Sequence, residues 1–227
     1  MLLNGQPSRT LWPAAAQDAV TVLDQRALPH RIESVVLHTV DDAVHAIAEM
    51  VVRGAPLIGV TAAYGLALQA RVDASDAALE RAASQLKSAR PTAVNLAWAV
   101  DRMSAQLVQR KPMDREATAW AFAGQLADDD AAVNERLGVH GVALLRLLAQ
   151  RKPERPLNVL THCNAGWLAT VDWGTALSPI YRAQAEGLPV HVWVDETRPR
   201  NQGASLTAFE LREQGVPHTV IADNAGG

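Results

Sequence analysis

Leu157-Asn158-Val159-Leu160-Thr161 opens the part of the chain that decides its fold class. Further short apolar runs alternate with segments of helical pattern: Val190–Val194 and Thr219–Ala222 as strands, with helices near Thr175–Glu186 and Ala204–Gln214. Gly187 and Gly215 follow the two helices, as glycines commonly do where a helix ends. Strand, helix, strand, helix, strand is half of a doubly wound parallel sheet, so an α/β fold is predicted.

The chain before these strands is predicted to be mostly helical. Branched residues favour two short strands at Ala19–Asp24 and Arg31–His38. The spacing of apolar residues predicts helices at Thr39–Val52, Pro56–Ala70 and Asp76–Lys87. A further helix is predicted to end at about Gln109, and another to cover Asp114–Gln150. The composition changes at residues 151–155. We therefore expect a helix-rich domain with short strands over residues 1–150 and a parallel-sheet domain over residues 151–227.

The number of predicted strands bears on completeness. Sheets of this kind usually have five or six strands, whereas the second domain accounts for only three before Gly227. The chain is therefore expected to be a C-terminally truncated fragment that exposes an edge of its parallel sheet.

Composition excludes several classes of function. The 227 residues are 48% hydrophobic and 20% charged, with a formal net charge of −3, which describes a globular chain and gives no electrostatic basis for binding nucleic acid. No apolar run reaches the length of a membrane helix, and the N-terminus lacks the pattern of a signal peptide. A single cysteine excludes an internal disulfide and a multi-thiolate zinc site. A reduced, cytoplasmic protein with no membrane or nucleic-acid partner and no metal is expected.

Cys163 is that single cysteine, and it stands directly after the first predicted strand. Ligands of open α/β sheets bind outside the carboxyl ends of the strands. The small residues after Cys163 are expected to open a helix, whose N-terminus would favour the thiolate. Taken alone, a buried structural cysteine is the commoner case. The residues around Cys163 instead favour a nucleophile or a base.

Two arginines precede predicted helices. Arg53-Gly54-Ala55-Pro56 would place a guanidinium beside unpaired backbone N–H groups, an arrangement that suits an anion. Arg90-Pro91-Thr92-Ala93-Val94-Asn95 repeats the arrangement. Each alone also fits an ordinary helix–helix turn or a capping sequence, but together they favour a phosphate pocket.

Polar loops follow the second and third predicted strands. Gln202, beside Gly203 in the loop that starts at Asp195, is expected to approach a ligand closely. Asp223 would bind a sugar hydroxyl or, more commonly, cap a helix. His162 is expected to face away from the cleft, because neighbouring residues of an extended chain face opposite sides.

Five segments, taken in order, resemble the methylthioribose-1-phosphate isomerases. They are Arg53-Gly54-Ala55-Pro56, Arg90-Pro91-Thr92-Ala93-Val94-Asn95-Leu96, Thr161-His162-Cys163-Asn164, Asp195-Glu196-Thr197-Arg198-Pro199 with Gln202-Gly203, and Ala222-Asp223-Asn224. The resemblance implies a helical domain with a small antiparallel sheet, then a Rossmann-like domain, in a homodimer. It implies that Cys163 is catalytic and that Arg53, Gly54, Ala55, Arg90 and Gln202 bind the substrate phosphate.

The implied reaction converts 5-methylthioribose 1-phosphate to its 1-phosphorylated ketose, in methionine salvage, without a cofactor. The family's catalytic aspartate lies in a later Gly-Ala-Asp-Arg-type segment that these 227 residues do not contain, and Asp223 matches a different position. The 227-residue chain alone is therefore expected to be inactive or severely impaired. Two alternatives stay open: a ribose-1,5-bisphosphate isomerase, and a non-catalytic subunit resembling the α, β and δ regulatory subunits of the exchange factor for translation initiation.

Overall fold

The computed structural model describes residues 1–151 and 153–226, which form two compact units. We call them the helical unit, Thr10–Ala27 with Ile32–Asp130, and the sheet unit, Met1–Arg9 with Leu28–Arg31 and Ala131–Gly227. Helix α5 (Pro112–Ala149) contributes residues to both units. The domain boundary expected at residues 151–155 stays a prediction. No helix among the described residues is both long and apolar enough to cross a membrane.

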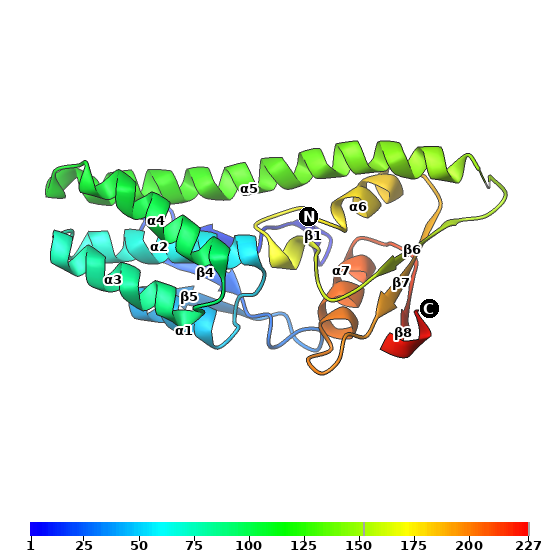
Figure 1. Ribbon diagram of the computed structural model, residues 1–227, viewed down its shortest axis with the longest axis horizontal. Coiled ribbons are helices and arrows are strands. Elements are labelled where there is room, and N and C mark those ends of the chain that lie inside the picture. The colour runs from blue at the N-terminus through cyan, green and yellow to red at the C-terminus, as the bar shows by residue number, and fades with distance from the viewer. Residues whose placement is uncertain (152, 227) are drawn as a thin grey trace. The chain divides into compact units, whose positions relative to one another are not determined.

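The helical unit combines a small antiparallel sheet with a group of packed helices (Figure 1). Its strands are β3 (Leu11–Pro13), β4 (Val20–Leu23) and β5 (Ser34–Leu37), with β4 in the centre. Its helices are α1 (Val40–Ala48), α2 (Ala55–Val72), α3 (Asp76–Ala89), α4 (Val94–Val108) and the first part of α5. These bounds confirm the mostly helical first half, and the antiparallel sheet implied by the resemblance.

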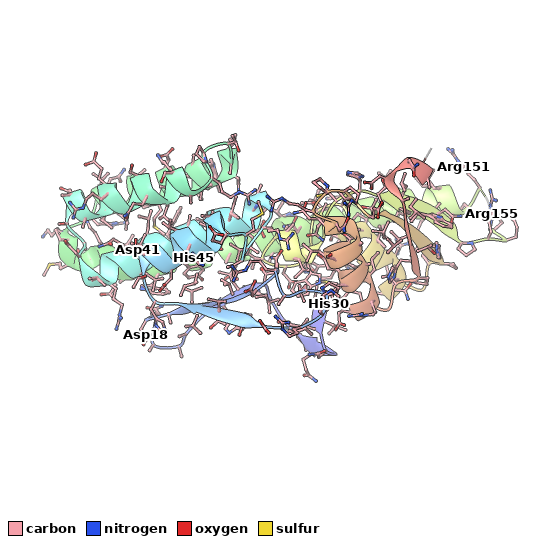
Figure 2. All side chains as sticks on the ribbon, turned by 90° about the horizontal axis from the view of Figure 1, so that it is seen from below. Asp18, His30, Asp41, His45, Arg151 and Arg155 are labelled. Carbon is pink, nitrogen blue, oxygen red and sulfur yellow. The ribbon has the colours of Figure 1, made fainter. Side chains whose placement is uncertain are left out.

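Local chemistry explains where these helices begin and how they pack. Thr39 caps α1, because its hydroxyl accepts the Asp42 N–H while the Asp42 carboxylate accepts the Thr39 N–H. Figure 2 shows Asp41 and His45 on this helix, where both are exposed. Helix α2 is buried on nearly every side, as its apolar sequence predicts. At Gly59 a methyl group would lie 2.9 Å from Asn95 Nδ2, so glycine allows α4 to approach α2.

The sheet unit is built on a three-stranded parallel sheet in chain order. Its strands are β6 (Leu157–Thr161), β7 (Val190–Asp195) and β8 (His218–Ile221), and its α-helices other than α5 are α6 (Ser178–Ala185) and α7 (Ala208–Glu213). A two-stranded antiparallel hairpin, β1 (Leu2–Leu3) with β2 (Gln6–Pro7), also belongs to this unit. Three parallel strands with intervening helices confirm the predicted α/β fold (Figure 1).

The two faces of the parallel sheet differ in exposure. Val192 and Val194 on β7 are fully buried, whereas Trp193 between them keeps 37% of its surface exposed. Leu160, paired with Trp193 in register, is 50% exposed. Helices cover both faces of most parallel sheets, so an uncovered second face with exposed apolar residues is unusual.

Three details differ from the sequence-based expectation. The segment after β6 does not open an α-helix: only the 3₁₀ turn η1 (Trp167–Ala169) occurs before α6. The helix expected over Ala204–Gln214 begins as a π-helical turn, η2 (Gly203–Thr207), and continues as α7. A further 3₁₀ turn, η3 (Asp223–Ala225), follows β8. Figure 2 places Arg151 and Arg155 in the segment between α5 and β6.

Candidate active site

Cys163 lies in the loop that follows β6, at the carboxyl edge of the parallel sheet. The residue is half-buried and has a φ of +60°, a conformation that is uncommon for residues other than glycine. Contacts from both sides hold its backbone: its N–H donates to Thr197 Oγ1 (2.8 Å), and its carbonyl accepts the Thr207 hydroxyl (2.7 Å). The thiol donates to Gln202 Oε1 at 3.0 Å. The structure therefore brings Cys163 and Gln202 together, 39 residues apart in sequence.

The expectation that a helix begins at Cys163 is wrong. The small residues that suggested a helix serve another purpose, because Gly166 lies directly against the carboxylate of Glu210. A methyl group on Gly166 would lie 1.7 Å from Glu210 Oε2. The loop therefore depends on a close contact with α7 rather than on a helical start.

The loop between β7 and η2 carries Gln202 and is anchored by Asp223. The Asp223 carboxylate accepts the backbone N–H groups of Thr197 and Arg198, each at 2.8 Å. These two bonds, from Arg198 first and then Thr197, hold the pKa of Asp223 below its ordinary value. Asp223 therefore fixes a loop and caps no helix, which corrects the role expected from its sequence.

The same loop closes tightly on the end of β7. Thr197 has a φ of +61°, which is strained for a β-branched residue, and its hydroxyl donates to the Asp195 carbonyl at 3.0 Å. A methyl group on Gly203 would lie 1.8 Å from that carbonyl oxygen, so only glycine fits there. The expectation that Gln202, next to this glycine, approaches a ligand closely stays a prediction.

His162 is exposed and bonds to the end of the neighbouring strand. Its Nδ1 lies 3.0 Å from Asp195 Oδ2. Three side chains at this edge could share a cation, because each offers one ligand atom and these atoms lie within 4.8 Å of one another: His162, Asp195 and Asp223. Both Asp223 oxygens accept backbone N–H groups, and Asp195 Oδ2 bonds to His162, so hydrogen bonds account for where these side chains lie. Asp195 Oδ1 is buried and has no hydrogen-bond partner among the described residues.

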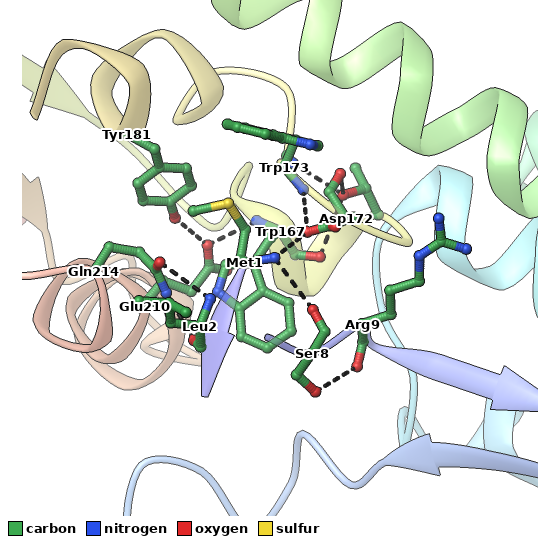
Figure 3. Close-up of polar contacts among 12 residues, drawn as sticks. Met1, Leu2, Ser8, Arg9, Trp167, Asp172, Trp173, Tyr181, Glu210 and Gln214 are labelled. Carbon is green, nitrogen blue, oxygen red and sulfur yellow. Dashed lines mark hydrogen bonds and ion pairs between the residues drawn. The ribbon is translucent and has the colours of Figure 1, made fainter. Parts of the chain in front are cut away.

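Glu210 is a buried part of the site that the sequence analysis missed. It lies on α7 and is fully buried, with Tyr181 and the Trp167 backbone in contact with its carboxyl group (Figure 3). Burial raises its pKa to about 7, even though its hydrogen bonds act in the opposite direction. A glutamate in a short helix normally suggests an exposed face, so its sequence gives no sign of this role.

Arg53, Gly54 and Ala55 lie at the start of α2 in the helical unit. Gly54 precedes the helix with a φ of +89°, and the helix has no side-chain cap. An uncapped helix start of this kind suits an anion, and a phosphate site here stays a prediction. Arg53 is half-buried, and its Nη2 donates to the Gln25 carbonyl at 2.9 Å, which fixes part of the guanidinium within this unit.

Arg90 ends α3, and α4 begins four residues later at Val94. The capping role considered for this segment is wrong, because α4 has no side-chain cap. Asn95 Nδ2 donates to the Ala55 carbonyl at 2.7 Å, so the starts of α2 and α4 lie together. Within the described residues the half-buried Arg90 side chain makes no hydrogen bond or ion pair.

The predicted site residues thus form two groups. Cys163 and Gln202 belong to the sheet unit, whereas Arg53, Gly54, Ala55 and Arg90 belong to the helical unit. A pocket of about 450 Å³ in the helical unit, between α3 and α4, contains none of them. That all six residues serve one site stays a prediction.

Comparison with known proteins identifies the family. Residues 51–227 match the model of the Initiation factor 2 subunit family, and the chain belongs to this family. The methylthioribose-1-phosphate isomerase of Methylocella silvestris is 59% identical over 228 residues, a match that covers 100% of this chain and 62% of the relative. The chain therefore spans less than two thirds of the length of this curated relative.

Two solved structures resemble the chain equally well. One is 5-methylthioribose 1-phosphate isomerase from Pyrococcus horikoshii OT3, with 35% identity and a TM-score of 0.82 over 97% of this chain and 62% of that chain. The other is translation initiation factor eIF-2B, subunit delta, from A. fulgidus, with 37% identity and a TM-score of 0.82 over 96% of this chain and 63% of that chain. The fold is therefore shared by proteins with different names.

Proposed function

We propose that the protein to which these residues belong isomerises 5-methylthioribose 1-phosphate to 5-methylthioribulose 1-phosphate, with Cys163 as a catalytic residue. The observation that carries the proposal is the pairing of the single thiol with Gln202 at the carboxyl edge of the sheet. The 59% identity to the Methylocella silvestris isomerase supports the choice of substrate.

The proposed reaction needs no external oxidant or reductant. The phosphate on C1 locks the sugar as an acetal, so an acid protonates the ring oxygen as the bond from that oxygen to C1 breaks. A base then removes the C2 proton to give an enol, and C1 gains a proton as the C2 hydroxyl becomes the ketone. A direct hydride shift from C2 to C1 is the alternative route. Each proton-transfer group contributes roughly 10²–10⁴-fold.

Cys163 is proposed either to remove the C2 proton or to stabilise the charged intermediate. Gln202 would hold the thiol through Oε1 and reach the phosphate through its amide N–H groups. Asp195 Oδ1 would accept a hydrogen bond from a sugar hydroxyl, since it is buried and has no partner among the described residues. Arg53 and Arg90, with the backbone at Gly54 and Ala55, would bind the phosphate.

A second candidate is a non-catalytic subunit of the exchange factor for translation initiation. The likeness to eIF-2B subunit delta from A. fulgidus, with a TM-score of 0.82, favours it. Such a subunit has no need of a thiol bonded to a glutamine at the sheet edge. The reactivity of Cys163 towards substrate therefore separates the two candidates.

The decisive experiment follows proton exchange at C2 by NMR in the full gene product. 5-Methylthioribose 1-phosphate is expected to exchange, and ribose 1,5-bisphosphate to exchange far more slowly. Cys163→Ser should abolish turnover, whereas the control Thr219→Ser, on exposed β8, should retain it. Unchanged turnover in Cys163→Ser would contradict the role of the thiol, and absence of exchange with either sugar would favour the regulatory candidate.

The phosphate contacts are tested separately. Arg53→Ala and Arg90→Ala are expected to lower kcat/KM by about tenfold to a hundredfold, the range of a lost charged hydrogen bond. Arg81→Ala, which removes an exposed arginine from α3, is the control and should have little effect. A homodimer and a cytoplasmic location belong to the same proposal, and sedimentation of the full gene product tests the first.

A further inference from the structure

Glu210 collects four hydrogen bonds on one buried carboxyl group. Oε1 accepts Asn164 Nδ2 at 2.8 Å and the Leu168 N–H at 3.0 Å. Oε2 accepts the Trp167 N–H at 2.8 Å and the Tyr181 hydroxyl. All four partners can donate, and the two backbone N–H groups can do nothing else. This set fits an ionised carboxylate, which accepts at both oxygens.

The charge of Glu210 has no cationic partner among the described residues. Tyr181 on α6 is the titratable side chain in contact with the carboxyl group, and burial raises its pKa well above the ordinary value. Arg212 and Glu213 on α7 pair with each other. The Met1 ammonium, also drawn in Figure 3, bonds instead to Asp172 Oδ1 at 2.6 Å. Hydrogen bonds rather than an ion pair therefore support the buried charge.

Two of these contacts lead directly to Cys163. Asn164, the next residue in the chain, uses one side-chain amide to bond both Glu210 and Thr207 Oγ1, the latter at 3.1 Å. The Thr207 hydroxyl in turn donates to the Cys163 carbonyl. The backbone amides of Trp167 and Leu168 fix the other end of the same loop on the same carboxylate. Glu210 thus holds both ends of the segment that carries the thiol.

We propose that Glu210 is a positioning residue for Cys163: its buried carboxylate holds the loop of residues 163–168 so that the thiol faces Gln202. The relevance to catalysis rests on the proposed function, because only then is Cys163 a reacting group. The unfavourable φ of Cys163 supports the proposal, since a strained conformation persists only where surrounding contacts enforce it.

Glutamine cannot replace Glu210 without cost. The NH₂ group of glutamine would face two of the four donors. One of those two is a backbone N–H, which can only donate, so that hydrogen bond would be lost. Gly166 lies directly against this carboxyl group, since a methyl group on Gly166 would lie 1.7 Å from Glu210 Oε2. Glu210→Gln therefore changes the contacts of the loop while nearly preserving side-chain volume.

The test measures alkylation of the thiol by iodoacetamide against pH in the 227-residue chain. Cys163 is the only cysteine, so the modified mass reports on that residue alone. In the unchanged chain we expect a step in the alkylation rate near pH 7, where Glu210 ionises. Glu210→Gln should lack this step and react at least about threefold faster at pH 8, because a released loop exposes the half-buried sulfur. The control Glu80→Gln, an exposed glutamate on α3, should match the unchanged chain.

Tyr181→Phe gives a second, milder test. The Tyr181 hydroxyl lowers the pKa of Glu210, so its removal should move the step to higher pH. A folded Glu210→Gln chain with an unchanged profile, or with slower alkylation, would overturn the proposal. If Glu210→Gln does not fold, an unmoved step in Tyr181→Phe would overturn it.

The same substitution in the full gene product separates this inference from the proposed function. Glu210→Gln should lower kcat/KM by at least about tenfold while substrate binding changes little. An altered alkylation profile with unchanged turnover would keep Glu210 as the residue that positions the thiol and reject Cys163 as a catalytic residue. An unaltered alkylation profile would reject the positioning role whatever the turnover.

Discussion

The buried carboxyl group of Glu210 predicts that the chain loses stability as the pH rises from about 4.5 to about 7. The ordinary pKa of a glutamate is 4.5, whereas the pKa of Glu210 in the folded chain is about 7. Between these values the unfolded chain has released the proton that the folded chain still holds. The folded state binds more protons there, so the free energy of unfolding falls with rising pH.

The expected loss follows from the width of this window. Each pH unit changes the free energy of unfolding by about 1.4 kcal/mol when the two states differ by one proton. Over the whole window the loss is therefore about 3 kcal/mol, which is a large part of the stability of an ordinary domain. Below pH 4.5 and above pH 7 the contribution of Glu210 is constant, because both states then carry the same charge.

Urea unfolding from about pH 5 to pH 8, followed by far-ultraviolet circular dichroism, measures the effect. The quantity compared is the difference in free energy between the unchanged chain and Glu210→Gln, since other titrating groups cancel in that difference. We expect the difference to fall with pH and then level off near pH 7. A difference that stays constant within about 0.5 kcal/mol across the range would refute the reasoning.

Three further predictions concern the loop and its neighbours. Thr207→Val should cost about 1–3 kcal/mol in urea unfolding because it removes two partly buried hydrogen bonds, whereas Thr219→Val, which removes one exposed hydrogen bond to His191, should change stability by less than about 0.5 kcal/mol. Gly166→Ala should lower the melting temperature, because its methyl group meets the buried carboxylate, whereas Gly124→Ala inside α5 meets nothing closer than 3.9 Å and should raise it. In Asp223→Asn, two loop N–H groups lose their charged acceptor, so their hydrogen exchange should accelerate by roughly tenfold. In the unchanged chain, the protection of these two N–H groups from hydrogen exchange is present above pH 3.8. It is lost as the pH falls through the lower pKa of Asp223 in the folded state.

The secondary structure could largely be predicted because apolar spacing carries most of the signal. The parallel strands at Leu157–Thr161 and Val190–Asp195 are apolar runs, and the buried helix α2 has an apolar sequence on all sides. The two strands of the N-terminal hairpin were missed because two residues each are too short for any periodicity.

The site could be predicted only in part, because its geometry depends on contacts that are distant in sequence. Gly203 suggested that Gln202 approaches a ligand closely, which stays a prediction, and the structure places the Gln202 amide oxygen against the Cys163 thiol. The small residues after the cysteine have the composition of a helix start, but the loop instead packs against Glu210, 44 residues later than Gly166. No local pattern distinguishes a buried glutamate with four hydrogen bonds from one on an exposed face.

The fold alone does not decide between an isomerase and an initiation-factor subunit, because structures with both names match the chain at the same TM-score. The proposal of an isomerase therefore rests on side chains at the sheet edge. Cys163 has a left-handed backbone conformation, and its N–H, carbonyl and thiol are each bonded to a different side chain. A subunit that only binds a partner has no need of this arrangement. Such a conformation costs about 1–3 kcal/mol and persists only where the surrounding contacts enforce it. Catalysis would explain why this unfavourable conformation is retained, because a reacting thiol must be held in one orientation before the substrate binds.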